Sequence, residues 1–97
     1  MSTNEDIKTI ADFYGEENQI DKTIEEMAEL TQALIKYKHS GGNLFKEQII
    51  EEITDVKIMI EQLEYLLKIT DDALISARIY KLSRTLSAIN REEKWKR

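Results

Sequence analysis

Two pairs of carboxylates stand three residues apart in the sequence, one formed by Glu26 and Glu29 and the other by Glu52 and Asp55. On a helical wheel at about 100° per residue, Glu26 and Glu52 fall inside the apolar arcs of their segments. Glu29 and Asp55 each lie about 60° away, on the edge of the same arcs. An antiparallel hairpin of the two segments would bring the pairs face to face.

Such a cluster is costly unless a cation or shared protons offset its repulsion. Two carboxylates about 5 Å apart repel by roughly 3 kcal/mol at an effective dielectric of 20. The ligands are oxygens, and the chain has no cysteine and one distant histidine, so the residues favour Mg²⁺, or Mn²⁺, over zinc. A di-iron bundle site is excluded because no Glu-x-x-His motif is present.

Breaks in the apolar pattern divide the chain into helical segments. Gly15 separates a short helix over residues 4–13 from a long helix that runs from Ile20 to Ser40. A second long helix is predicted over about Leu44 to Lys68. A third follows residues 70–72, which offer an N-cap and acids at the positive end of the helix dipole.

Each long segment carries an apolar stripe with spacings of three and four residues. The stripes are Ile20, Ile24, Met27 and Leu34, then Ile49, Ile53, Val56, Ile60, Leu63 and Leu67, then Ile75, Ile79, Leu82, Leu86 and Ile89. They predict one all-α domain over residues 1–97, an antiparallel bundle of three long helices plus a short N-terminal helix. Because so small a body has little interior, we expect oligomerisation to complete the bundle.

The charge and hydrophobicity of the sequence bear on whether the protein binds nucleic acids or membranes. The 97 residues carry 19 acids and 14 bases, a net charge of −5, which disfavours nucleic acid as a partner. Residues 78–97 are locally basic, which is a weak counter-signal. The chain lacks a secretion-signal pattern and has no apolar run near the roughly 18 residues that span a bilayer, so we expect no membrane association and a cytoplasmic location.

The segments Ile24–Leu30 (IEEMAEL) and Glu51–Val56 (EEITDV) together resemble the all-α nucleoside triphosphate pyrophosphohydrolases of the MazG type. That family has a Glu-x-x-Glu on one helix and a Glu-x-x-Asp on the next, and the resemblance covers roughly residues 17–90. It implies hydrolysis of a nucleoside or deoxynucleoside triphosphate to the monophosphate and pyrophosphate with Mg²⁺, by a homodimer or homotetramer. It also implies that Glu26, Glu29, Glu52 and Asp55 hold the metal and form the catalytic site.

Triphosphate hydrolysis also needs protein cations near the phosphates. Lys81 and Arg84 lie three residues apart near the edge of the third apolar stripe and resemble basic residues that many relatives carry after the acidic motif. Lys22, one turn before Glu26, is a further candidate for phosphate, and Gln19 is a candidate for hydrogen bonding to a base. Each of these residues has an ordinary surface role as its alternative.

Two other functions fit the same residues. In a non-catalytic helical interaction module, the apolar faces bind a partner and the acids are solvated. In a nucleotide sensor, nucleotide and metal bind without turnover. Acid pairs three residues apart are common on solvated helices, so either pair alone is weak evidence, and the repetition on two apolar faces favours the metal site.

Overall fold

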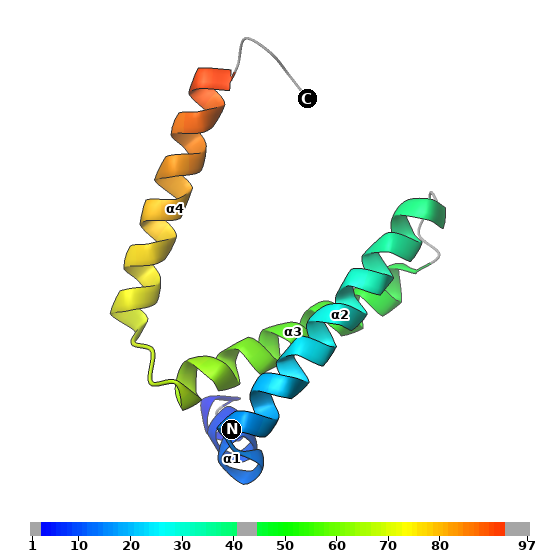
Figure 1. Ribbon diagram of the computed structural model, residues 1–97, viewed down its shortest axis with the longest axis vertical. Coiled ribbons are helices and arrows are strands. Elements are labelled where there is room, and N and C mark those ends of the chain that lie inside the picture. Colours follow the sequence, from blue (N-terminus) through cyan, green and yellow to red (C-terminus); the bar gives the residue numbers. More distant parts are fainter. Residues whose placement is uncertain (1–2, 41–44, 93–97) are drawn as a thin grey trace.

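The computed structural model describes residues 3–40 and 45–92, and within these ranges the chain is all α-helical, without β-strands. The helices are α1 (Thr3–Tyr14), α2 (Glu16–Ser40), α3 (Lys46–Leu66) and α4 (Asp71–Glu92), as Figure 1 shows. Three long helices and a short N-terminal one were predicted, and this is confirmed. None of the described helices has the length and apolar character that crossing a membrane requires.

A sharp corner at Gly15 joins α1 to α2. Gly15 has a φ of +87°, a conformation that side-chain-bearing residues rarely adopt. Its backbone N–H donates to the carbonyl of Ala11 at 2.8 Å, and the Asn18 side chain donates to the carbonyl of Tyr14 at 2.8 Å. A Cβ at Gly15 would meet only open space, so its backbone conformation, and not crowding, is what favours glycine here.

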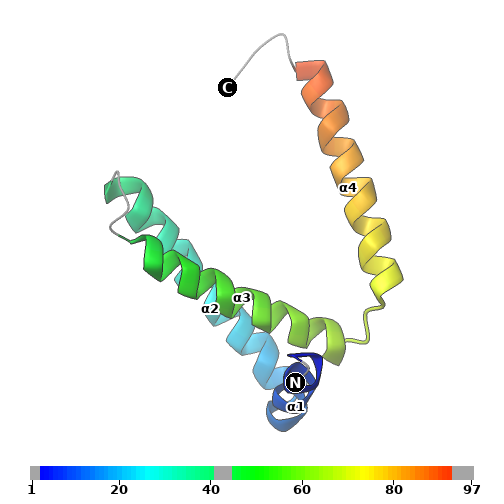
Figure 2. The ribbon, with the colours of Figure 1, turned by 180° about the vertical axis from the view of Figure 1, so that it is seen from behind.

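Helices α2 and α3 form an antiparallel hairpin, and α1 packs across the end of it away from the connection between them (Figures 1 and 2). The Tyr65 hydroxyl ties α1 to α3 by donating to the Asp12 carboxylate at 2.9 Å. The Lys8 ammonium lies 5.8 Å from the centroid of the Tyr65 ring. Among the described residues the buried apolar core is small: Ala11, Ala33, Val56 and Met59.

The face of α2 that packs on α3 is not the apolar stripe that the sequence suggests. Its buried residues are Gln19, Thr23, Glu26 and Ala33. The predicted stripe, offset from them by one position, is exposed, and Ile24 in that stripe is 61% exposed. Periodicity shows that an apolar stripe exists, but it does not show which helix covers it. Here α3 covers the polar stripe of α2 and leaves the apolar stripe exposed.

The end of α3 differs from the prediction, because the helix stops at Leu66 and does not reach Lys68. Lys68 has a φ of 58°, in the left-handed region. Its N–H donates to the carbonyl of Tyr65 at 3.1 Å, and the Ile69 N–H donates to that of Glu64 at 2.9 Å. This pair of bonds is the Schellman helix ending, with lysine where glycine is usual.

Helix α4 begins with the predicted N-cap, since the Thr70 hydroxyl accepts from the Ala73 N–H at 3.1 Å. Beyond this turn α4 packs against none of the other helices, and it has no buried residue. It projects from the hairpin as a second arm (Figures 1 and 2). The three long helices therefore do not close into one bundle within a single chain over the described residues.

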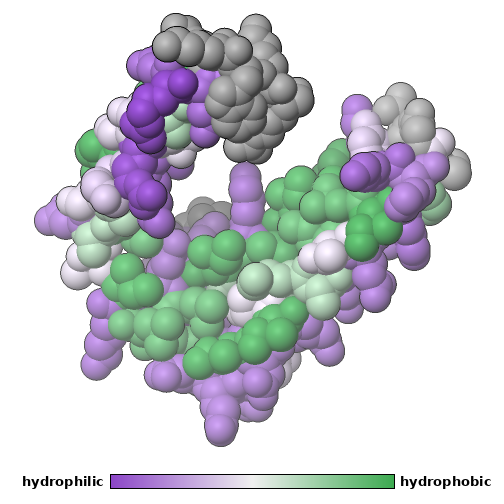
Figure 3. Space-filling view, turned by 45° about the horizontal axis from the view of Figure 1, so that its top comes forward, coloured by the Kyte–Doolittle hydropathy of each residue, from purple (hydrophilic) through white to green (hydrophobic). Residues whose placement is uncertain are grey.

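The open arrangement leaves much apolar surface in contact with solvent. Hydrophobic residues gather along the hairpin in the space-filling view (Figure 3). The radius of gyration is 17.1 Å, whereas a compact domain of this length has about 12.5 Å. The fold thus presents an acidic seam inside the hairpin and apolar side chains outside it.

Candidate metal centre

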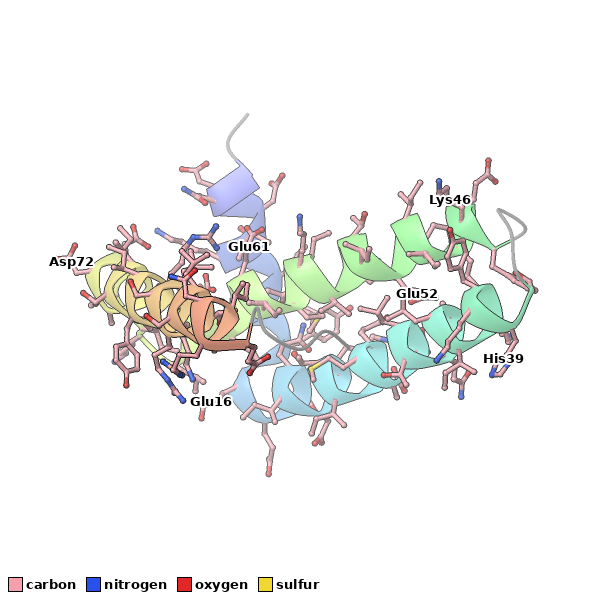
Figure 4. All side chains as sticks on the ribbon, turned by 90° about the horizontal axis from the view of Figure 1, so that it is seen from above. Glu16, His39, Lys46, Glu52, Glu61 and Asp72 are labelled. Atoms are coloured by element: carbon pink, nitrogen blue, oxygen red, sulfur yellow. The ribbon has the colours of Figure 1, made fainter. Side chains whose placement is uncertain are left out.

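The α2–α3 seam positions the predicted carboxylates. Glu26 lies on α2 among the buried seam residues and is only 8% exposed. Glu52 lies on α3 and points into the space between the two helices (Figure 4). Val56, one turn after Glu52, is buried in the same seam. The antiparallel pairing therefore brings one acid from each predicted motif to the same place.

One carboxylate oxygen from each of Glu26, Glu52 and Asp55 lies within 4.8 Å of the other two. We call these three residues the acidic triad. Their burial is graded, with Glu26 buried, Glu52 half-buried and Asp55 exposed, so the triad runs from the seam to the solvent. Three carboxylates so close together repel one another strongly in the partly buried setting.

Two oxygens of the triad are unsatisfied. Oε1 of Glu26 and Oε1 of Glu52 are buried and accept no hydrogen bond. A buried carboxylate oxygen without a donor is expensive, because folding removes its water without replacing it. Both orphaned oxygens belong to the cluster in which three acids converge, and a cation bound there would satisfy them.

Glu29, the fourth predicted carboxylate, lies beside the triad but contributes no oxygen to it. Its side chain is exposed, and its pKa is raised, first by the charge of Glu26 and then by partial desolvation and the charge of Glu52. The four acids therefore share one electrostatic field, in which Glu29 is the outer member. The two motifs are brought together as predicted, although with unequal roles.

Lys22 supplies a positive charge at the edge of the triad. Its ammonium lies 2.8 Å from Oε1 of Glu25 and 3.3 Å from Oε2 of Glu26. Hydrogen bonds to Glu25 and then Glu26 raise the pKa of Lys22 far above its usual value, so the ammonium stays charged. The predicted contact of Lys22 with a phosphate stays a prediction. Glu25 is the exposed partner of Lys22.

Gln19 lies in the seam and not at the surface, the more common setting considered for it. Its amide donates to the side-chain oxygen of Gln62 at 2.7 Å, and both residues are buried. The Gln62 amide in turn contacts the Met59 sulfur at 3.6 Å. This amide pair holds α2 against α3 and uses one of the two N–H groups of the buried Gln19 amide. Gln62 has no distinguishing pattern in the sequence, and its partner is 43 positions away in the chain.

Lys81 and Arg84 are not brought to the acids. Both lie on α4, which does not pack against α2 or α3. Arg84 instead stacks over the Tyr80 ring, 5.7 Å from its centroid. At about 100° per residue Arg84 lies about 180° from the centre of the α4 apolar stripe, so it is not at the stripe's edge as expected.

The donor set of the triad fits a hard divalent cation. All its ligand atoms are carboxylate oxygens, which suit Mg²⁺ or Mn²⁺, and the two orphaned oxygens are free to bind one. His39, the single histidine, lies in the last turn of α2, where a positive charge is favourable. Figure 4 shows it at the far end of the hairpin from α1.

Comparisons with models of known families, with curated proteins and with solved structures found no match to this chain. The chemistry of the site therefore rests on its own residues. Those residues place two glutamates and an aspartate from neighbouring helices around one point, with a lysine at the rim.

Proposed function

We propose that the protein is a Mg²⁺-dependent pyrophosphohydrolase that converts a nucleoside or deoxynucleoside triphosphate to the monophosphate and pyrophosphate. The observation that carries the proposal is the convergence of the acidic triad, in which two buried oxygens lack partners. The acid motifs that resemble the MazG type support the same reaction. A homodimer or homotetramer would be the working unit, and Mn²⁺ is a plausible substitute for Mg²⁺.

Glu26, Glu52 and Asp55 would hold the ion, with Glu29 beside them. The bound ion would supply neutralisation of phosphate oxyanions and polarisation of a water molecule. Glu29 is the candidate proton acceptor for that water, because its carboxylate is exposed next to the triad and is not one of its three converging groups.

Lys22 is the candidate phosphate ligand of this chain. Its ammonium is half-exposed and lies against Glu26, so a triphosphate bound at the triad would meet it at the rim. The proposal does not depend on Lys81 or Arg84, because α4 stands apart from the hairpin. Gln19 is assigned a structural role, since its nitrogen is bonded to Gln62.

The activity is tested by incubating the purified protein with a panel of nucleoside and deoxynucleoside triphosphates, with and without Mg²⁺. We expect equimolar monophosphate and pyrophosphate from at least one substrate, and only with the metal. Release of inorganic phosphate alone would point to a different bond, and no product from any substrate would overturn the enzyme assignment.

A binding measurement separates the enzyme from the two alternatives. Calorimetry with Mn²⁺ alone should give binding to the wild-type protein and none to Glu52→Gln, with Glu61→Gln as the matched control. Glu61 is an exposed acid on the same helix that faces away from the seam. Binding of metal and nucleotide without product indicates a sensor, and failure to bind either favours an interaction module.

A further inference from the structure

Helix α4 carries an apolar stripe that no other described helix of the chain covers. Its members are between 51% and 62% exposed and repeat at spacings of four and three residues: Ile75, Ile79, Leu82, Leu86 and Ile89. That repeat forms a straight seam along one side of a helix. An amphipathic helix of this kind is stable in water when its stripe is packed against another element.

The hairpin has an uncovered apolar face of its own. The face consists of Ile20, Ile24, Met27 and Leu34 on α2, Ile53 and Ile60 on α3, and Leu67 directly after α3, all of which are exposed. On the helical wheel of α2 these residues lie about 100° from the buried residues that face α3. On the wheel of α3 they lie at nearly the same angle, in the same rotational sense, from the buried residues that face α2. In an antiparallel pair, equal offsets point to one side of the hairpin.

The acids lie on the opposite side of the hairpin. Glu29 and Asp55 are offset from the seam in the other direction, by about 60° on the wheels of their own helices. The hairpin thus separates an apolar face from an acidic one, with Glu26 and Glu52 in the seam between them. A helix docked on the apolar face would leave the acidic triad open.

The exposed area exceeds what a monomer of this size would show. The chain exposes 8138 Å², whereas a compact monomer of the same mass exposes about 5,800 Å². The excess of about 2,300 Å² per chain is comparable with the roughly 1,000 to 2,500 Å² per partner buried in obligate interfaces. The uncovered surfaces are therefore large enough for a stable dimer.

Charge favours a hairpin as the partner of α4. Residues 78–91 contain Arg78, Lys81, Arg84 and Arg91 and no acid, a charge of +4. Residues 16–66 hold twelve acids and five bases, a charge of −7. Two α4 helices packed side by side would bring these like charges together, whereas a hairpin that is negative overall avoids that repulsion.

The turn before α4 favours a hairpin from another chain. The Schellman bonds at Lys68 and Ile69 and the Thr70 N-cap fix the backbone between α3 and α4. They direct α4 away from its own hairpin (Figure 1). Folding α4 back onto the same chain would break these local bonds, whereas docking onto a second copy preserves them.

We propose that α4 of one chain packs its apolar stripe onto the apolar face of the α2–α3 hairpin of a second copy, reciprocally in a two-fold dimer. Each chain then contributes one arm and receives one, as a closed symmetric dimer requires. The inference does not rest on the proposed hydrolysis, because it concerns surfaces on the side of the hairpin away from the acids.

The first test is molar mass by light scattering during gel filtration. We expect the wild-type protein to elute as a dimer, twice the 11.4 kDa chain mass. Leu82→Glu and Ile24→Glu should each weaken the dimer at least tenfold. Ser87→Glu and Gln32→Glu should not, because these exposed residues lie on other faces of α4 and α2. A monomeric wild-type protein, or equal effects in all four variants, would overturn the proposal.

The second test identifies which surfaces meet, using the absence of native cysteine. A chain with Ile24→Cys is mixed with a tagged chain that has a cysteine at one stripe position of α4, from Ile75 to Ile89 in turn, and the mixture is oxidised. At least one position should give a disulfide between the two chains, and Ser87→Cys should give none. Disulfides between two α4 helices, or within one doubly substituted chain at high dilution, would each refute the arrangement.

Discussion

The acidic side of the hairpin and its apolar face differ in what each requires from outside the chain. On the acidic side, two buried oxygens lack a hydrogen-bond donor. On the apolar face, large side chains such as Ile24 remain in water. A small cation that diffuses freely in solution would satisfy the acids, whereas covering the apolar face requires a protein surface of matching shape. Under the two proposals, one helix pair would serve two kinds of recognition through opposite sides.

This division has a cost inside the hairpin. Helix α2 packs Gln19, Thr23 and Glu26 against α3. The seam therefore buries polar groups at positions where a hairpin with a purely apolar core would bury isoleucine or leucine. Among the described residues, two of the four buried apolar side chains are alanines, so the core of one chain is thin. The proposed metal ion and the proposed second chain would therefore both add to the stability of the hairpin.

The largest expected effect is on the acidic side. Glu52→Gln should lower the hydrolysis rate at least about 100-fold, because a charged group aimed at the reacting centre is lost. Without metal it should be no less stable than the wild-type protein, since it removes a buried unpaired charge. Pyrophosphate release and thermal unfolding measure the two effects, with Glu61→Gln as the control. An active, metal-binding Glu52→Gln protein would remove the triad from the mechanism.

The next largest effect is a difference in unfolding free energy between substitutions in the α2–α3 seam and substitutions on α4. Met59→Ala deletes one of the few buried apolar side chains and should cost about 2 to 4 kcal/mol of unfolding free energy at any protein concentration. Leu82→Ala should cost little in dilute solution and more as the concentration rises, because its stripe would be covered only in the proposed dimer. Urea unfolding at two concentrations checks this, and a concentration-independent loss in Leu82→Ala would contradict it.

A smaller effect is expected at the amide pair in the seam. Gln62→Ala leaves the buried Gln19 amide without its acceptor and should cost about 1 to 3 kcal/mol. In the cycle of Gln19→Leu, Gln62→Leu and the double leucine variant, the double variant should lose less than the sum of the two single losses, because neither polar group is then left unpaired. Strictly additive losses in this double-mutant cycle would show that the hydrogen bond does not couple the two helices.

The smallest expected effect is at the contact between α1 and α3. The hydrogen bond to Asp12 raises the pKa of the Tyr65 hydroxyl, so folding favours the protonated form. The contribution of this hydrogen bond to folding stability is therefore complete below the unfolded pKa of tyrosine, about 10, and is lost as pH rises through the higher folded pKa. Unfolding followed from pH 8 to 11 should show a steeper loss in the wild-type protein than in Tyr65→Phe, and identical slopes would count against the contact.

The helices and the acidic triad were accessible from the sequence because both follow from local spacing. Glu26 and Glu52 stand at the same position of two matched i, i+3 pairs, and an antiparallel hairpin brings such pairs together without further information. The Thr70 cap was accessible for the same reason, since a cap is made within one turn. Glu29 was predicted as a fourth metal ligand, whereas the converging group consists of Glu26, Glu52 and Asp55.

The choice of seam was not accessible, because it depends on which of two adjacent stripes finds a neighbour. Ile20 and Gln19 differ by one position, and hydrophobicity alone selects the wrong one for this chain. The direction of α4 depends on Lys68, a residue type that gives no sign of a left-handed turn. Within the described part of one chain α4 stands apart from the hairpin, so the expected bundle, which was to be completed by oligomerisation, stays a prediction.

The ion pair between Lys22 and Glu26 bears on how a metal ion would bind to the acidic triad. Its ammonium holds one oxygen of Glu26 at 3.3 Å, so part of the charge of the cluster is already balanced by a covalently attached cation. Under the proposed function, a divalent ion would have to share Glu26 with the Lys22 ammonium. We therefore expect Lys22 to raise the metal concentration at which the acidic triad is half-occupied.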